Sequence, residues 1–176
     1  MNIKIIKQQN VSLQCIVCGL ENEASLRTQF LETEGGVLVA VPYVNSRHQS
    51  YPNRMHGGVI AALLDEVVGR AYQIEYPDMW GVTAGLEVRY SKPVALEQQV
   101  YVVGRITQGE GRMFEGTGEI YLAESGELLA SAFAKYVKLP VEKIASADFL
   151  HTQWVEDRRA MPDIRNFAMP KRRELV

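Results

Sequence analysis

Cysteine, histidine and long apolar runs are scarce in this chain of 176 residues. It has 2 cysteines and 3 histidines, so the disulfide framework of a small secreted domain is excluded. The first 20 residues carry lysines at positions 4 and 7 but no apolar run as long as a signal peptide or membrane helix requires. We therefore expect a cytoplasmic protein with reduced thiols and no membrane association.

An excess of charge of either sign is also absent. Nineteen Lys and Arg residues face 21 Asp and Glu residues, a net charge of -2. This balance argues against a nucleic-acid partner, and we interpret the basic run at residues 171–173 as solvated surface. The 47% hydrophobic fraction is that of an ordinary globular protein. We expect one domain over residues 1–140, with a lead-in over 1–24, and a helix and tail over 141–176 that form no independent domain.

Strand-like runs flank one long helical segment. Gly35-Gly36 makes a tight turn between two of the runs, which predicts a hairpin, and short links between the later runs predict antiparallel neighbours. The expected strands are residues 25–33, 37–41, 80–90, 99–108, 113–122 and 128–138; the expected helices are 58–75 and 141 to about 159. The pattern predicts an α+β fold with a five- to six-stranded antiparallel sheet wrapped around a central helix.

The glycine turn His56-Gly57-Gly58 leads directly into the central helix. The N–H groups of Gly57 and Gly58 belong to the first turn, where backbone donors have no helical acceptor and can hold a developing oxyanion. The alternative is that both glycines only make the turn. His56 could orient a substrate, hold the loop or simply pack, and packing is the commoner role of a histidine beside a turn.

Asp65 lies on the side of this helix opposite its apolar stripe. Small residues share that side, which suggests a second buried face such as a subunit interface. A partly desolvated carboxylate is a candidate general base or nucleophile, whereas an ordinary exposed helix residue is the alternative. Asp65 lies about 12 Å along the helix axis from Gly57, so a partner subunit or a long substrate would have to join them. Glu66 is nearer the apolar stripe and is the weaker candidate.

Other hydrolytic centres find little support. No histidine stands at metal-ligand spacing from His56, and no serine occupies a Gly-x-Ser-x-Gly turn. Cys15 and Cys18 have the Cys-x-x-Cys spacing of half a zinc site, but the chain offers no second half, so we interpret them as packing thiols. We therefore expect no metal.

Several segments together resemble the hotdog-fold acyl-CoA thioesterases of the phenylacetate-degradation type. The resemblance covers residues 15–137 and leaves out the C-terminal extension. It rests on the motifs Cys15-Ile16-Val17-Cys18-Gly19-Leu20-Glu21-Asn22, His48-Gln49-Ser50-Tyr51-Pro52-Asn53, His56-Gly57-Gly58, Leu63-Leu64-Asp65-Glu66, Gly81-Val82-Thr83 and Arg89-Tyr90-Ser91-Lys92-Pro93-Val94.

The resemblance implies a homodimer joined edge to edge, with active sites at the interface, and leaves open whether two dimers pair. By analogy, the Gly57 N–H polarises the thioester carbonyl and Asp65 acts as base or nucleophile. Thr83 of the partner subunit would assist Asp65, and His56 would shape the turn and the pocket.

Substrate contacts are expected around these groups, from Ser50, Asn53, Gly58, Glu66, Arg89 and Lys92. Ser50 replaces an asparagine found in some family members, which removes one positioning amide. Asn53 replaces a glycine, but asparagine tolerates the left-handed backbone that such a turn uses. Arg89, Lys92, Arg105 and Arg112 could meet the phosphates of coenzyme A (CoA), although basic residues on strands are more often plain surface charge.

The sequence thus predicts an acyl-CoA thioesterase whose only cofactor group is the CoA of its substrate. The altered loop and the unexplained tail motivate an alternative, a non-catalytic hotdog protein that binds acyl groups or CoA. A hotdog dehydratase is disfavoured because the Asp-x-Asn-Pro-x-His pattern is missing.

Overall fold

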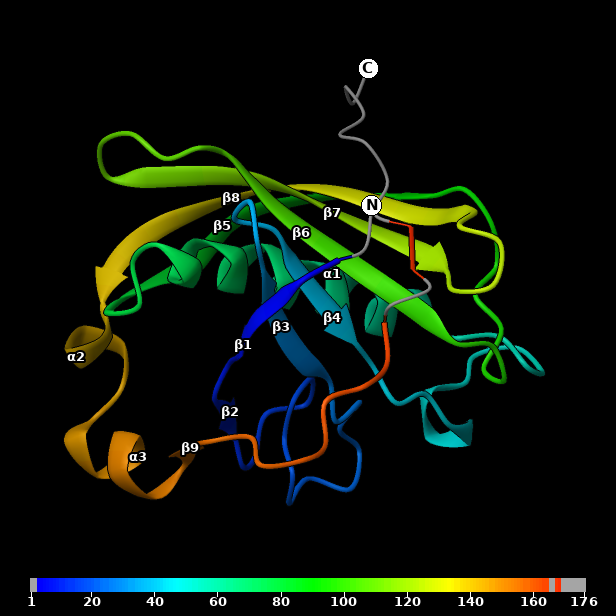
Figure 1. Ribbon diagram of the computed structural model, residues 1–176, viewed down its shortest axis with the longest axis horizontal. Helices are drawn as coiled ribbons and strands as arrows, with labels where there is room; N and C mark the ends of the chain where they lie inside the picture. Colours follow the sequence, from blue (N-terminus) through cyan, green and yellow to red (C-terminus); the bar gives the residue numbers. More distant parts are fainter. Residues whose placement is uncertain (1–2, 165–166, 169–176) are drawn as a thin grey trace.

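One long helix packed against a seven-stranded antiparallel sheet forms the body of the computed structural model, which describes residues 3–164 and 167–168 (Figure 1). In spatial order the strands are β1 (Ile5–Gln8), β3 (Gln29–Thr33), β4 (Leu38–Val41), β6 (Val100–Gln108), β7 (Met113–Leu122), β8 (Leu128–Pro140) and β5 (Met79–Tyr90). The helix α1 spans Gly57–Ala71, and the 3-10 helix η2 (Tyr72–Ile74) continues it. The predicted α+β fold is confirmed.

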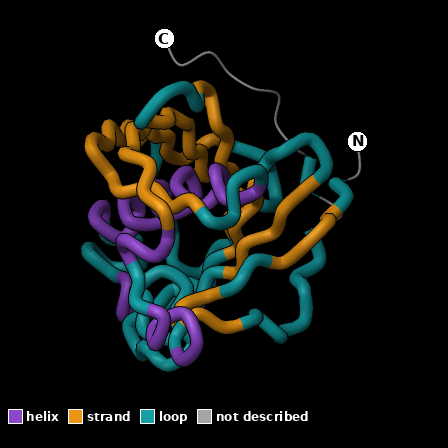
Figure 2. The backbone as a smooth tube through the Cα atoms, turned by 90° about the vertical axis from the view of Figure 1, so that its left-hand side faces the viewer, coloured by secondary structure: helices purple, strands orange, loops and turns teal. Residues whose placement is uncertain are grey.

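The apolar stripe of α1 lies against the inner face of the sheet, whose strands curve around it (Figure 2). The buried helix residues are Ile60, Leu63, Leu64, Val67, Val68, Arg70 and Ala71. Glycine in the sheet permits this close packing, because a Cβ on Gly104 would lie only 2.5 Å from the Val67 carbonyl oxygen. A larger residue there would push the helix away from the sheet.

The sheet has more strands than the sequence predicted. The additional strand is β1, which pairs with β3 and comes from a stretch whose mixed sequence indicated no element. The hairpin of β3 and β4 and the strands β5 to β8 lie where alternation predicted them. At the opposite edge from β1, β5 leaves most of its side chains exposed. Such an edge can accept another strand.

The single helix expected over residues 141–159 is wrong. The chain forms α2 (Val141–Ile144), then α3 (Ala147–Thr152), then β9 (Trp154–Val155), which pairs with β2 (Val11–Ser12) in a small separate sheet. Ser146 explains the break, because its Oγ accepts a hydrogen bond from the Phe149 N–H at 3.1 Å and so begins a new helix.

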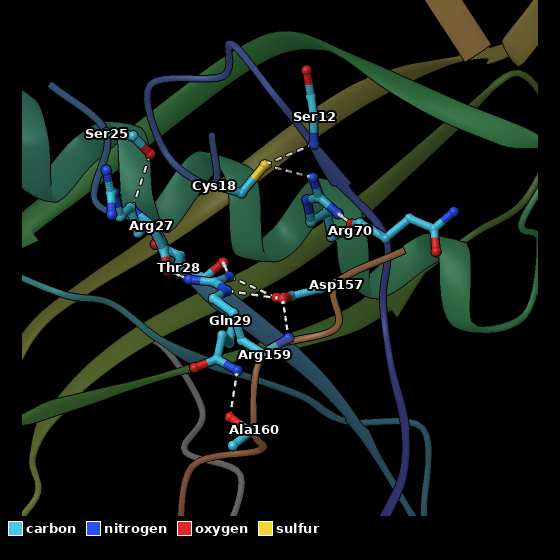
Figure 3. A network of polar contacts seen from close by, with 11 residues as sticks. Ser12, Cys18, Ser25, Arg27, Thr28, Gln29, Arg70, Asp157, Arg159 and Ala160 are labelled. Atoms are coloured by element: carbon cyan, nitrogen blue, oxygen red, sulfur yellow. Dashed lines mark hydrogen bonds and ion pairs between the residues drawn. The ribbon is translucent and has the colours of Figure 1, made fainter. Parts of the chain in front are cut away.

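Asp157 and Arg159 attach the segment after β9 to the start of β3 (Figure 3). Arg159 Nη2 donates to Asp157 Oδ2 at 2.6 Å. The same guanidinium donates to the backbone carbonyls of Arg27 at 2.5 Å and Thr28 at 3.4 Å. These three contacts centre on one arginine, and the two to backbone carbonyls join residues more than a hundred positions apart.

The C-terminal segment also covers the outer face of the sheet. Ile164 and Phe167 pack into an apolar cluster with Leu31, Val39 and Tyr101, on the side away from α1. The basic run at residues 171–173 lies outside the described residues. Within the described part of the chain, no helix is both long and apolar enough to cross a membrane.

Candidate active site

Asp65 is held by two hydroxyl groups from the sheet. Thr83 Oγ1 donates to Asp65 Oδ1 at 2.9 Å, and Tyr136 Oη donates to the same oxygen at 3.0 Å. Tyr136 Oη also lies 2.8 Å from the Asp65 carbonyl oxygen. Thr83 on β5 and Tyr136 on β8 are register partners, so strand pairing places their hydroxyls side by side.

Partial burial makes Asp65 more basic than an exposed aspartate. The pKa of its carboxyl is raised from 3.8, mainly because burial disfavours the charged form. The hydrogen bonds from Thr83 and Tyr136 act against this shift, and the charge of Glu66 adds to it. The carboxylate is thus oriented by its donors and still strengthened as a base.

A pocket of about 200 Å³ opens beside Asp65. Its walls come from α1, from the β5–β8 pair, from the N-terminal segment and from the C-terminal extension. The lining residues are Ser12, Cys15, Asp65, Glu66, Gly69, Arg70, Gln73, Trp80, Gly81, Thr83, Tyr136, Phe149 and Trp154. Trp154 of β9 lies against Trp80 of β5, with ring centroids 5.0 Å apart. The extension that sequence left without a role therefore closes one side of this pocket.

Two expectations about the Asp65 side of the helix need correction. Thr83 reaches Asp65 within one chain, so no partner subunit is needed for that contact. Gly69, expected to leave room for a partner, faces Tyr136 of its own chain, because a Cβ on Gly69 would lie 3.4 Å from that ring.

The other end of the predicted site lies at the start of α1. His56 is the N-cap of the helix, and its Nδ1 accepts the Gly58 N–H at 2.9 Å. The Gly58 N–H is therefore occupied by His56, and the expectation that both glycines offer donors is wrong. Within the described residues, the Gly57 N–H meets no acceptor. The Gly57 carbonyl accepts a hydrogen bond from Tyr90 Oη at 2.9 Å.

The loop before α1 is held by its own side chains. Asn53 has a φ of 54°, which confirms that asparagine adopts the left-handed conformation here. Its Oδ1 accepts the Leu96 N–H at 3.2 Å, and its own N–H donates to Gln49 Oε1 at 2.8 Å. The Ser50 N–H donates to the Arg54 carbonyl at 2.8 Å, and Ser50 is exposed. Asn53 is thus engaged in the turn, whereas Ser50 remains at the surface.

The charged residues expected to touch substrate are mostly paired inside the chain. Glu66 Oε1 accepts from Arg70 Nε at 2.6 Å, and Arg70 is buried. Lys92 forms an ion pair with Glu127 at the surface. Arg89 is exposed on β5. Glu66 lines the Asp65 pocket but is committed to Arg70, which the sequence did not indicate.

Polar contacts surround both cysteines, unlike the packing thiols that the sequence predicted. Arg70 Nη2 donates to Cys18 Sγ at 3.1 Å (Figure 3), and the Val17 N–H donates to Cys15 Sγ at 3.3 Å. The pKa of Cys15 is lowered to about 7, chiefly by a hydrogen bond from the Cys18 thiol. That same bond, together with burial, raises the pKa of Cys18.

Sequence reasoning missed Tyr136, Tyr90 and the aromatic residues of the extension. Tyr136 belongs to a strand whose alternation places it on the helix side, but no motif distinguishes it from a core tyrosine. Its ring does pack as one, 4.7 Å from the Phe114 ring. Only its hydroxyl contacts with Asp65 reveal a further role.

Comparison with known proteins agrees with this geometry. Residues 53–129 match the thioesterase superfamily. A long helix packed into a curved antiparallel sheet is the hotdog fold, which this chain shares with a solved protein of that superfamily.

Three relatives illustrate the match. Acyl-coenzyme A thioesterase THEM4 of Mus musculus is 33% identical over 95 residues, which cover 54% of this chain and 40% of that protein. A crystal structure of a thioesterase superfamily protein has a TM-score of 0.64 and 27% identity, covering 72% of this chain and 61% of the other. Protein BH2602 of Bacillus halodurans, solved with CoA, has a TM-score of 0.58 and 24% identity, covering 66% of this chain and 76% of its own. This chain spans about half the length of the curated relatives that it matches: 56% of one and 40% of the other.

Proposed function

We propose that this protein hydrolyses an acyl-CoA thioester, with Asp65 as the group that activates water. The observation that carries the proposal is a half-buried carboxylate held by Thr83 and Tyr136 at the wall of a pocket. Both hydroxyls donate to Oδ1, which leaves Oδ2 to accept a proton from water. Asp65 would act as general base in this scheme. The alternative mechanism is direct attack by the Asp65 carboxylate on the thioester carbon.

The carbonyl end of the reaction is assigned to Gly57. Its N–H lies in the first turn of α1, where the helix dipole favours negative charge. During hydrolysis, water loses a proton to Asp65 and its oxygen adds to the thioester carbon, while the Gly57 N–H holds the oxyanion. The C–S bond then breaks, and the CoA sulfur leaves with the proton returned from Asp65. No cofactor beyond the CoA of the substrate takes part.

A homodimer is part of this proposal. Gly57 and Asp65 are about 12 Å apart along one helix, too far to act on one carbonyl group from the same chain. Gly57 is absent from the lining of the Asp65 pocket. The exposed edge of β5 can pair with a second copy. Gly57 of one subunit would then meet Asp65 of the other, and pairing of two dimers stays open.

Support for a CoA ester comes from the relatives. THEM4 is named an acyl-coenzyme A thioesterase, and BH2602 was solved with CoA. Arg89 and Lys92 on and after β5 are assigned to the CoA phosphates, and the pocket beside Trp80 and Trp154 to the acyl group. Lys92 would have to break its ion pair with Glu127 to bind a CoA phosphate. A cytoplasmic location belongs to the proposal as well.

The test is release of CoA from a panel of acyl-CoA esters, followed with a thiol-trapping dye. Asp65→Asn should lower kcat by roughly 100- to 10,000-fold, the usual range for loss of a general base. Asp78→Asn, which neutralises an exposed aspartate outside this pocket, should match wild type. If Asp65→Asn releases CoA as fast as wild type, Asp65 is not part of the mechanism.

A non-catalytic acyl- or CoA-binding protein is the second candidate. The observation in its favour is the exposed Ser50, where some relatives of this type carry an amide, with only the Gly57 N–H left as donor. Release of no CoA from any ester, with saturable CoA binding by calorimetry, would favour this candidate over hydrolysis.

A further inference from the structure

Cys15 and Cys18 lie in one turn, close to Glu66 of α1. We propose that Cys15, Cys18 and Glu66 bind a divalent cation of the Zn²⁺ class, with a fourth position open to the Asp65 pocket. The three ligand atoms, two sulfurs and one carboxylate oxygen, all lie within 4.8 Å of one another. This site is additional to the proposed hydrolysis, and no step of that reaction passes through it.

The local backbone has the shape that such a turn requires. The Gly19 N–H donates to the Cys15 carbonyl at 2.8 Å, which closes a tight turn around the two cysteines. A Cβ on Gly19 would lie 2.3 Å from that same carbonyl oxygen, so only glycine fits after Cys18. Two cysteines at this spacing are typical of one half of a structural zinc site.

The sulfurs are surrounded by hydrogen-bond donors. Cys15 Sγ accepts the Val17 N–H, and Cys18 Sγ accepts both the Ser12 N–H at 3.4 Å and Arg70 Nη2 at 3.1 Å (Figure 3). Neutral thiols are weak acceptors, whereas metal-bound thiolates are strengthened by such donors. A packing pair or a disulfide gives no reason for three donors.

The charges also balance when a divalent cation is present. Two thiolates and the Glu66 carboxylate leave one net negative charge around the ion. Arg70, buried between the rings of Phe30 and Trp154, supplies the compensating positive charge. Arg70 bonds one Glu66 oxygen, and a carboxylate has a second oxygen for the metal.

The fit needs only a small movement. Ligand atoms around tetrahedral Zn²⁺ stand roughly 3.8 Å apart when the bonds are about 2.3 Å long. The three ligand atoms lie within 4.8 Å of one another, and Glu66 is partly exposed, so its side chain has room to adjust toward a shared ion. Because Cys15 and Glu66 line the pocket, the fourth coordination position faces it.

The experiment uses the full chain, reduced, stripped with a chelator and titrated with Co²⁺ and then Zn²⁺. We expect one Co²⁺ per chain with thiolate charge-transfer absorption, displaced by Zn²⁺, and a higher melting temperature with Zn²⁺. Cys15→Ser should weaken binding by more than about 100-fold, beyond the loss typical of an outer-shell change. Glu66→Gln should weaken metal binding at least about tenfold. Glu75 is an exposed acid beyond the helix, so Glu75→Gln should leave metal binding unchanged.

A second measurement needs no variant, so misfolding cannot obscure the answer. Zn²⁺ should protect the partly exposed Cys15 thiol of wild type from alkylation. Absence of the charge-transfer band with Cys15 still reactive in Zn²⁺ would overturn the site, as would unchanged affinity in Glu66→Gln. Since no substrate is present, this result is independent of CoA release. The protein can bind Zn²⁺ without hydrolysing an ester, and it can hydrolyse an ester without binding Zn²⁺.

Discussion

At the scale of single residues, the hydroxyls of Thr83 and Tyr136 determine how Asp65 points. Both donate to Oδ1, and Asp65 lines the pocket, so Oδ2 is the oxygen that we assign to the water. They are positioning residues, because they act on substrate through Asp65. Loss of either should misplace the base without removing it.

We predict that Tyr136→Phe and Thr83→Val each lower kcat by up to about 100-fold, the cost of a misplaced catalytic group. Tyr136→Phe keeps the ring that packs on Phe114, so the melting temperature should change little. Steady-state kinetics of the two variants, with the exposed Tyr43→Phe as control, provide the check. In an Asp65→Asn background neither change should matter; a further loss there would point to a structural role instead.

Gly57→Pro removes the N–H assigned to the oxyanion while sparing the helix. Gly57 is the first helical residue, where proline is tolerated, and His56 before it is already extended at φ −65° and ψ 137°. No internal hydrogen bond of the described chain is lost. We predict a fall in kcat of roughly 100- to 1,000-fold, the usual loss of one oxyanion donor.

The matched control is Gly57→Ala, which retains the N–H and places its Cβ 3.6 Å from the Tyr90 ring, an ordinary contact. Circular dichroism should show both variants folded. If Gly57→Pro hydrolyses the best acyl-CoA as fast as Gly57→Ala, Gly57 is not the oxyanion donor.

At the scale of elements, Asp157 and Arg159 hold the C-terminal extension against β3. Asp157→Asn removes a charge-assisted contact to Arg159, and we predict a loss of about 2 kcal/mol in the free energy of unfolding. Urea denaturation measures it. The adjacent pair Glu156–Arg158 is solvent-exposed, so Glu156→Gln should leave stability unchanged.

The same contact predicts a pH dependence. Burial raises the pKa of Asp157, but the hydrogen bonds from Arg159 outweigh this effect, and the folded-state pKa lies below 3.8. The contribution is therefore complete above the unfolded pKa and disappears as the pH falls through the lower folded value. The stability difference between wild type and Asp157→Asn should be constant near neutrality and shrink below about pH 4; a difference that grows in acid would contradict the assignment.

Elements with a local signature could be predicted from the sequence. The hairpin around Gly35-Gly36 and strands β5 to β8 follow from alternation and turn residues, and α1 from its apolar stripe. The left-handed turn at Asn53 was also predictable. Asp65 was singled out as a candidate because an acidic residue interrupts a helix of small and apolar side chains.

What the sequence could not show depends on long-range pairing. Strand β9 is only two residues long and exists because β2 lies beside it, more than a hundred positions earlier. Glu66 meets Cys15 and Cys18 in the same way, so the third ligand of the proposed metal site had no sequence signal. The contact of Thr83 with Asp65 within one chain was not foreseen, because the position of β5 beside α1 cannot be read from periodicity.

At the scale of the whole molecule, the two halves of the proposed site lie at different places on one chain. Asp65, Thr83 and Tyr136 share a pocket, whereas the Gly57 N–H lies at the other end of α1 beside Tyr90. A two-fold dimer through the β5 edge would bring the Gly57 end of one subunit to the Asp65 pocket of the other. Every active site would then contain one contribution from each chain.

Mixing two inactive variants tests this arrangement. In a dimer of Gly57→Pro and Asp65→Asn subunits, one site carries both lesions and the other carries neither, provided that each site combines both chains. Co-expression with two different tags and purification over both isolate the mixed dimers. An assay of CoA release from these dimers should give about half of the wild-type activity, because each mixed dimer contains one intact site of two. If each site lay within one chain, every mixed dimer would carry two damaged sites, and activity would stay at the level of the separate variants.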